Sequence, residues 1–106
     1  MFDFAQCRLD DAEIKNINTD GNQLVVTYVD WQEQERKLVF NDVAGYQCFS
    51  AEGKPISAGI VENDTVLVSM ACEAADEKST EGFQVYSFLS AWTAAKILRI
   101  VARSVG

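Results

Sequence analysis

The sequence predicts an all-β protein in which an antiparallel meander forms a sandwich or an open barrel, as one domain over residues 1–106. Apolar and polar residues alternate through most of the chain, turn residues interrupt this pattern at short intervals, and no long helical pattern separates the segments. The chain has the length of a single domain, and its 48% hydrophobic fraction is sufficient for one core. An α+β arrangement with a C-terminal helix on the sheet is the alternative.

The first predicted element is a β-hairpin near the N-terminus. Residues 12–18 form its first strand, and the dipeptide Asp20-Gly21 supplies the turn, because both residue types tolerate a positive φ. The return strand covers residues 23–31 and carries apolar side chains on both of its faces. We therefore expect this strand to lie in the middle of the sheet.

Three shorter segments follow the hairpin. Residues 36–40 alternate as a strand with one solvent-exposed face, and residues 46–50 resume an extended pattern after a turn. Residues 56–61 are ambiguous between strand and loop, since Gly59 weakens a strand there. These segments extend the predicted meander.

Residues 65–72 show the most regular alternation in the chain. Val66, Val68 and Met70 fall on one face of a strand over this range, which is the pattern of a half-buried strand. Residues 73–82 read as a charged loop, and residues 83–89 as a further strand. A strand over 65–72 is therefore expected.

The C-terminal segment fits two patterns. Residues 91–103 keep an apolar stripe at helical spacing, but from Lys96 onward they are β-branched and alternate. We favour a last strand that begins at about Lys96. The predicted core combines the inward positions of all these strands: Leu24, Val26, Leu38, Phe40, Val66, Val68, Val85, Leu98 and Ile100.

The charge of the chain is strongly acidic, with nine basic and sixteen acidic residues and a net charge of −7. The last eleven residues hold three of the bases and none of the acids, so residues 1–95 carry −10. Nucleic acids and anionic membranes are therefore not expected as partners, because they bind through Lys and Arg. A basic protein fits this charge, and plain solubility is the other explanation.

The cysteines and the N-terminus favour a cytoplasmic protein. Cys7, Cys48 and Cys72 form no C-x-x-C pair, and they are interpreted as small buried hydrophobic residues. The N-terminus lacks the basic and apolar regions of a signal peptide, and no apolar run approaches the ~20 residues of a membrane span.

The absence of histidine argues against catalysis and against a resident metal or cofactor. Without histidine, the usual serine and cysteine hydrolases and most zinc sites lack an essential group. The spacing of Asn16, Asn18, Asp20 and Gly21 resembles half of a calcium loop, but Thr27 stands where the bidentate glutamate belongs. The glycines match no phosphate-binding loop. No enzyme, metal or cofactor is expected.

Paired carboxylates could still act without histidine, as they do in glycoside hydrolysis. Two acidic clusters occur, at residues 10–13 and 30–35. Both stand at polar turns, where solvated side chains are the ordinary case. A carboxylate-based hydrolase is therefore a remote alternative.

The aromatic residues supply the candidate contact site. Trp31 and Trp92 stand at the ends of predicted strands, and Tyr86 precedes Trp92 on the same strand. Tryptophan and tyrosine are enriched where proteins bind one another, although at strand ends they more often cover a core. Trp31, Tyr86 and Trp92 are the candidate interface residues, with Tyr86 conditional on exposure beside Trp92.

Three segments carry a resemblance to a known class of protein. They are Asp11-Ala12-Glu13-Ile14 through Asp20-Gly21, Tyr28-Val29-Asp30-Trp31, and Leu38 through Gly45, with Phe88-Leu89-Ser90-Ala91-Trp92 further on. The chain resembles small bacterial β-rich domains, some of which are immunity proteins of polymorphic toxin systems. This resemblance implies a stoichiometric binder that blocks a toxin.

The functional prediction is accordingly a small, acidic, non-catalytic protein-binding module, of the toxin-neutralising immunity type. Its acidity would speed association with a basic nuclease toxin. The alternative is a β-barrel domain that binds a small molecule in its mouth.

Overall fold

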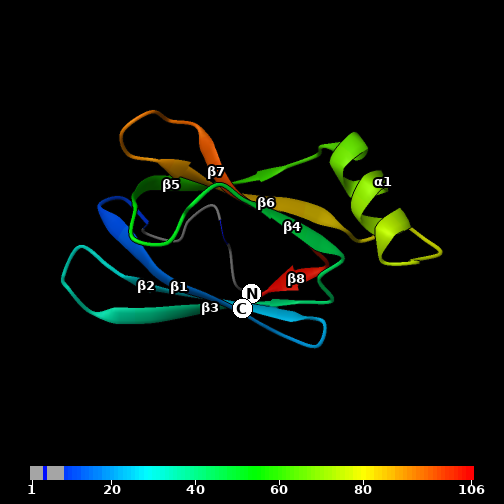
Figure 1. The fold of residues 1–106 in the computed structure, drawn as a ribbon, viewed down its shortest axis with the longest axis horizontal. Helices are drawn as coiled ribbons and strands as arrows, with labels where there is room; N and C mark the ends of the chain where they lie inside the picture. The colour runs from blue at the N-terminus through cyan, green and yellow to red at the C-terminus, as the bar shows by residue number, and fades with distance from the viewer. Residues whose placement is uncertain (1–3, 5–8) are drawn as a thin grey trace.

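A computed structural model describes Phe4 and residues 9–106, which form one antiparallel sheet of eight strands and one short helix (Figure 1). The elements are β1 (Ala12–Asp20), β2 (Gln23–Val29), β3 (Glu35–Asn41), β4 (Gly45–Cys48), β5 (Pro55–Glu62), α1 (Thr65–Ala74), β6 (Gln84–Ser90), β7 (Lys96–Ala102) and β8 (Ser104–Val105). Their order across the sheet is β4-β7-β6-β5-β1-β2-β3-β8. The expected antiparallel β architecture is confirmed, as an open sheet that does not close into a barrel. The expectation of one continuous meander without a helix is wrong, because β4 lies beyond β7, β8 lies beyond β3, and α1 stands between β5 and β6.

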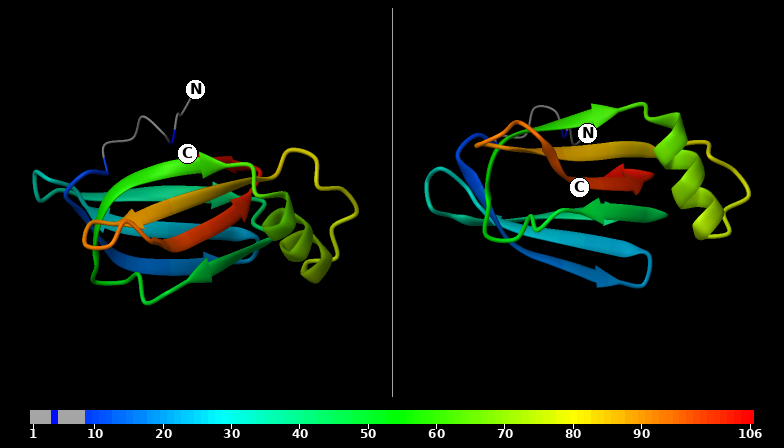
Figure 2. Two further views of the ribbon diagram at one scale, coloured as in Figure 1. Left: turned by 90° about the horizontal axis from the view of Figure 1, so that it is seen from above. Right: turned by 45° about the horizontal axis from the view of Figure 1, so that its top comes forward.

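The sheet coils so that its two halves face each other across the main core (Figures 1 and 2). One half contains β5, β6, β7 and β4, and the other contains β1, β2, β3 and β8. Phe40 of β3 and Phe88 of β6 meet in this core with ring centroids 6.2 Å apart, and Phe4 packs edge-on against both. The interior is therefore closely packed with aromatic rings.

The N-terminal hairpin forms as predicted, but its two turn residues are Gly21 and Asn22, because Asp20 is the last residue of β1. β1 and β2 pair from Glu13↔Val29 to Asp20↔Gln23, and Gly21 takes a φ of +61° in the turn. β2 lies between β1 and β3, and Leu24 and Val26 are fully buried. The central position expected from its two-sided apolar pattern is confirmed.

The C-terminal segment is a strand, as favoured, and the alternative of a C-terminal helix is wrong. β7 is hydrogen-bonded to β6 on one side and to β4 on the other. Leu98 and Ile100 are fully buried, and both belong to the main core. A helix would leave these two neighbouring strands without their shared partner.

The prediction of a strand over residues 65–72 is wrong, because α1 occupies Thr65–Ala74. Asp64 caps the helix, since its Oδ1 accepts a hydrogen bond of 3.0 Å from the backbone N–H of Leu67. The buried positions Leu67, Val68 and Cys72 follow helical spacing. Val66, which was expected in the core, is 68% exposed.

The ambiguous residues 56–61 belong to β5, and Gly59 has a steric role there. A Cβ atom on Gly59 would lie 2.6 Å from Cζ of Phe4 and 2.8 Å from Cδ1 of Leu9. The aromatic ring therefore occupies the space that any larger residue would need.

Candidate protein-interaction surface

α1 lies across the outer face of β6 and β7, on the opposite side of these strands from the main core. Val85 and Val101 are paired across the two strands, are fully buried, and contact the helix residues Leu67 and Val68. Phe83 completes this second cluster and lies beneath the guanidinium of Arg103, 4.5 Å from its ring centre. Helix and sheet are thus joined by a small apolar cluster.

A charged network adjoins this cluster and fixes the start of α1. Arg99, on the outer face of β7, donates to Oδ2 of Asp64 at 2.7 Å while Asp64 caps the helix through its other oxygen. The N–H of Leu67, followed by Arg99, holds the pKa of Asp64 below its usual value. Asp64 is therefore a charged link between the helix and the sheet.

Glu62 continues the network on the sheet. Its carboxylate accepts hydrogen bonds from Ser87 and, at 2.5 Å, from Lys96, and it lies 3.6 Å from Arg99. Burial by itself raises the pKa of Glu62, but the bonds from Lys96 and Ser87 outweigh it and the pKa is lowered. The pKa values of both carboxylates are lowered and their charges are balanced by Lys96 and Arg99, so they stabilise the fold and lack the raised pKa of a general acid.

A groove of about 230 Å³ runs between β4 and α1. The helix approaches β4 closely at Gly45, where an added Cβ would lie 3.3 Å from Cβ of Ala71. The lining residues share one property, the absence of charge: Ala44, Gly45, Tyr46, Gln47, Leu67, Met70, Ala71, Ala74 and Val101. In a chain that is 24% charged, this is a distinct neutral region.

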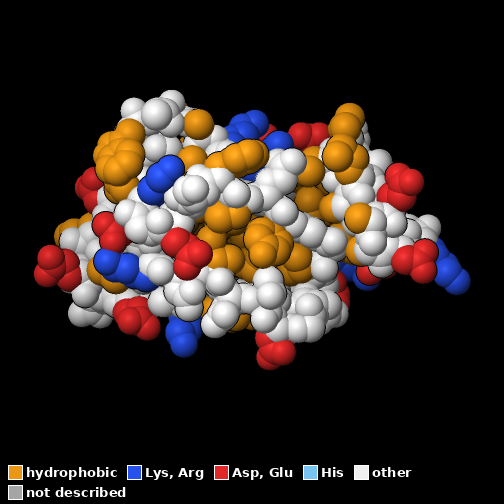
Figure 3. All heavy atoms as spheres, in the orientation of Figure 1, with side chains coloured by type: hydrophobic (Ala, Val, Ile, Leu, Met, Phe, Trp, Pro, Cys, Tyr) orange, Lys and Arg blue, Asp and Glu red, His pale blue; other side chains and the backbone are white. Residues whose placement is uncertain are grey.

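Exposed hydrophobic side chains occur on both segments that form this groove, and two of them, Tyr46 and Met70, line it. Seven large hydrophobic residues of the described chain are exposed, and four of them, Tyr46, Phe49, Val66 and Met70, belong to β4, to the residue after it, or to α1. Figure 3 shows hydrophobic side chains in the middle of this face, over β4, and reaching toward α1. We call the groove and these four residues the β4–α1 surface.

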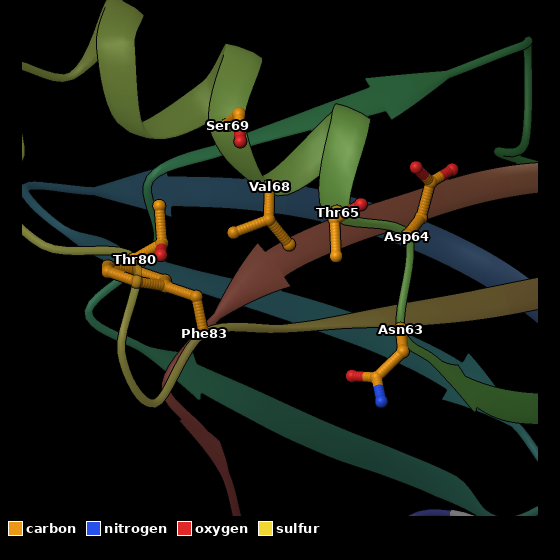
Figure 4. A pocket seen from close by; sticks show the side chains of 7 residues that line it. All are labelled: Asn63, Asp64, Thr65, Val68, Ser69, Thr80 and Phe83. Atoms are coloured by element: carbon orange, nitrogen blue, oxygen red, sulfur yellow. The ribbon is translucent and has the colours of Figure 1, made fainter.

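A smaller hollow of about 120 Å³ lies at the first turn of α1 (Figure 4). Val68 and Phe83 border it, together with the polar side chains of Asn63, Ser69 and Thr80. The carboxylate of Asp64 points away from it, toward its partner Arg99 (Figure 4). The volume is well below the ~300 Å³ of a typical ligand pocket.

The two acidic clusters noted in the sequence meet at the opposite end of the molecule. Asp11 and Glu13 from one cluster, and Asp30 and Glu33 from the other, line one open groove of about 430 Å³ beside Trp31. Glu13 is paired with Lys15 at 2.5 Å. The structure thus brings together carboxylates that are distant in the sequence.

Asp30, the least exposed of these carboxylates, organises a turn. Its Oδ1 accepts from the backbone N–H groups of Gln32 and Gln34 at 2.9 Å each, and its Oδ2 accepts from Arg36 at 3.0 Å. The bond from Gln34, together with those from Arg36 and Gln32, lowers the pKa of Asp30 against the opposing effect of burial. An ionised carboxylate with this many donors is a structural group, so the geometry gives a hydrolase no support.

The candidate interface residues from the sequence lie in different environments. Trp92 is 71% exposed in the loop between β6 and β7, and Trp31 is half exposed after β2. Both loops lie at the end of the molecule away from α1 (Figure 1). Tyr86 is buried against Phe4 and Phe40, and burial raises its pKa, so the exposed pair of Tyr86 and Trp92 does not form.

Sequence reasoning missed the β4–α1 surface because it depends on α1. With residues 65–72 read as a strand, Met70 was placed on an inward face, whereas it is 59% exposed on the helix. The available signal was the dipeptide Asn63-Asp64 ahead of the apolar run, which is typical of a helix N-terminus.

The two described cysteines lie in different environments. Cys72 is buried in α1 as expected, and burial raises its pKa, but Cys48 on β4 is exposed, contrary to expectation. Cys7 lies outside the described residues.

Comparisons with known proteins found no relative of this chain: no family model, no curated protein and no solved structure matches it. Within the described part of the chain, no three His, Cys, Asp or Glu side chains are arranged to hold a metal ion. No helix among the described residues has the length and apolarity to cross a membrane.

Proposed function

We propose that this chain is a non-catalytic protein-binding module that takes a basic protein on the β4–α1 surface. The observation that carries the proposal is an uncharged groove lined by the exposed side chains of Tyr46 and Met70, with Phe49 and Val66 also exposed on the segments that form it. Contiguous apolar patches on small proteins commonly mark interaction sites. Met side chains adapt well to a partner's shape.

The charge of the chain supports a basic partner. The groove itself is neutral, while residues 1–95 carry a net charge of −10. Exposed carboxylates occur on the segments that form the groove: Glu73 belongs to α1, and Asp42, ahead of β4, accepts a hydrogen bond from Asn22. An apolar centre with charged surroundings matches the anatomy of specific interfaces, and the acidic field would speed association with a basic protein.

The resemblance to immunity proteins narrows the class of partner to test first. A basic toxin of the same system, above all a nuclease, would be blocked by one copy of this acidic module. Acidic surfaces suit such toxins because the toxin's own nucleic-acid site is positively charged.

The alternative of a small-molecule-binding barrel has less support. Its binding site would be the interior of a closed barrel, but the sheet is open and Phe4, Phe40, Tyr86 and Phe88 pack together inside it. The space that a ligand would need is filled by side chains.

Site-specific photo-crosslinking in the native host tests the proposal. A photoreactive phenylalanine analogue at Met70 should capture a protein of high isoelectric point, and the same analogue at Trp92 should capture it far less. The association rate of the purified pair should fall steeply with added salt. Equal capture at the two positions, or capture only at Trp92, would overturn the assignment of the surface.

A further inference from the structure

The free edge of β4 is suited to receive an added strand. We propose that the partner binds by laying an extended segment along this edge as a ninth strand of the sheet; this inference rests on the proposed function. The segment is apolar at alternate positions and carries Lys or Arg at its ends. Strand addition is an established mode of recognition, because backbone hydrogen bonds supply affinity and alternate side chains supply specificity.

Backbone groups of β4 point outward along this edge. β4 is one of the two terminal strands of the sheet, and among the described residues it pairs with β7 alone. The N–H of Phe49 donates to the carbonyl of Ile97 at 2.8 Å, and Gln47 lies opposite Arg99. Because bonding alternates along an antiparallel pair, the N–H and C=O groups of Tyr46 and Cys48 point away from β7. These groups have the direction that an added strand needs, and no hydrogen bond joins them to the described strands.

Charged side chains stand along the incompletely paired sides of β1 and β3. β5 pairs with β1 at Ala12 and Glu13, and the rest of that side of β1 presents Lys15 and Asp20. β3 is unpaired on its outer side over 35–37, which reads Glu-Arg-Lys. Charged side chains protect sheet edges from pairing with other chains. β4, with the sequence Gly-Tyr-Gln-Cys, has no such protection. Among the described residues, β5 beyond Ile56 and the short terminal strand β8 are also incompletely paired and carry no charge before Glu62, so it is the groove beside β4 that distinguishes its edge.

α1 shapes the site for a strand. The groove of about 230 Å³ lies between residues 44–47 and the helix, so a strand beside the first part of β4 would lie next to α1. Side chains alternate between faces along a strand. Tyr46 pairs with the core-facing Ile100, whereas Met70 and Ala74 belong to the helix on the outer face. Successive apolar residues of the segment would therefore contact Tyr46 and Met70 in turn.

The net charge of the chain favours a basic segment over a second copy of this chain at the edge of β4. A second copy of this chain would bring a net charge of −7 against an equal charge. A segment with Lys or Arg at its ends would instead meet a chain of opposite net charge, whose exposed carboxylates include Glu73 of α1. The basic partner is therefore favoured over self-association.

The test uses a matched pair of variants and a defined probe. The probe is a fluorescein-labelled peptide of alternating valine and threonine with two lysines at each end, and fluorescence anisotropy measures its binding. Cys48→Pro removes an outward N–H and leaves the bonds to β7 intact, because proline is accepted on edge strands where its nitrogen faces solvent. Cys48→Ser is the control. We expect Cys48→Ser to bind like the unaltered protein and Cys48→Pro to bind at least about tenfold more weakly.

Amide hydrogen exchange supplies a second measurement that does not depend on the proline variant folding. In the Cys48→Ser protein, saturating peptide should slow exchange at the amides of residues 46 and 48. Slowed exchange with weakened binding of Cys48→Pro supports strand addition.

Unchanged hydrogen exchange at both amides would overturn the strand-addition proposal. Failure of the unaltered protein to bind the peptide would overturn it as well, and so would a dimer that forms through β4 and is detected by sedimentation. The proposed function would survive these results if photo-crosslinking at Met70 still captured a basic protein.

Discussion

The two apolar clusters on the opposite faces of β6 and β7 differ in size and in role. The main core joins both halves of the sheet around Phe4, Phe40, Tyr86 and Phe88, whereas the second cluster holds one helix through a few aliphatic side chains and Phe83. Burial of apolar surface is the dominant favourable contribution to folding. The main core therefore determines whether the chain folds, and the second cluster determines whether the β4–α1 surface exists.

The largest expected effect is in the main core. Phe88→Ala should lower the free energy of unfolding by about 3–5 kcal/mol, because a fully buried ring would be replaced by a cavity. That is a large share of the stability of a small domain. Urea denaturation followed by circular dichroism measures it. Phe49→Ala, at a ring that is 59% exposed, should change the value by no more than about 0.5 kcal/mol.

Val68→Asp should have the next largest effect and should act on the second cluster. An unpaired carboxylate among Leu67, Val85 and Val101 should cost about 3 kcal/mol and detach α1 from the sheet. Val66→Asp is the matched control, and its exposed position predicts little change. Equal destabilisation by the two substitutions would indicate a strand over these residues, since positions 66 and 68 would then share a face.

Alanine substitutions at two glycines allow a direct comparison of the packing in the two clusters. Gly59→Ala places a methyl group 2.6 Å from the ring of Phe4, and should cost about 1–3 kcal/mol. Gly45→Ala places one 3.3 Å from Ala71, beside the helix, which can shift slightly. We expect a change below about 1 kcal/mol there, and thermal denaturation should separate the two variants. A larger effect at Gly45 would show that α1 is held as rigidly as the core.

The smallest expected effect concerns the charged link to α1. The pKa of Asp64 is lowered in the folded protein, so its contribution is present above the unfolded carboxyl pKa of about 3.9 and is lost as pH falls through the folded pKa. Asp64→Asn keeps the helix cap but loses the charge opposite Arg99. The variant should be slightly less stable than the original at pH 7 and equal to it near pH 2. A difference that persists in acid would assign the loss to the cap.

The strands were predictable where one face of a segment is buried in the main core. β2 and β3 alternate because Leu24, Val26, Leu38 and Phe40 all point inward. Such a pattern is local, so a single segment reveals it. The candidate surface was less predictable, since it combines α1 with β4, a strand that has one neighbour among the described strands.

The sequence by itself determined the antiparallel β architecture, the first hairpin, the C-terminal strand and the acidity, because each depends on local patterns or on composition. The tertiary structure decided the secondary structure of residues 65–74, because their valines fit a strand and a helix equally well. Asp64 caps a helix there, and the apolar side chains of Val85 and Val101 pack against it. It also buried Tyr86, exposed Met70 and left the edge of β4 open. The exposure of a side chain depends on neighbours that are distant in the sequence, and no local sequence pattern specifies these neighbours.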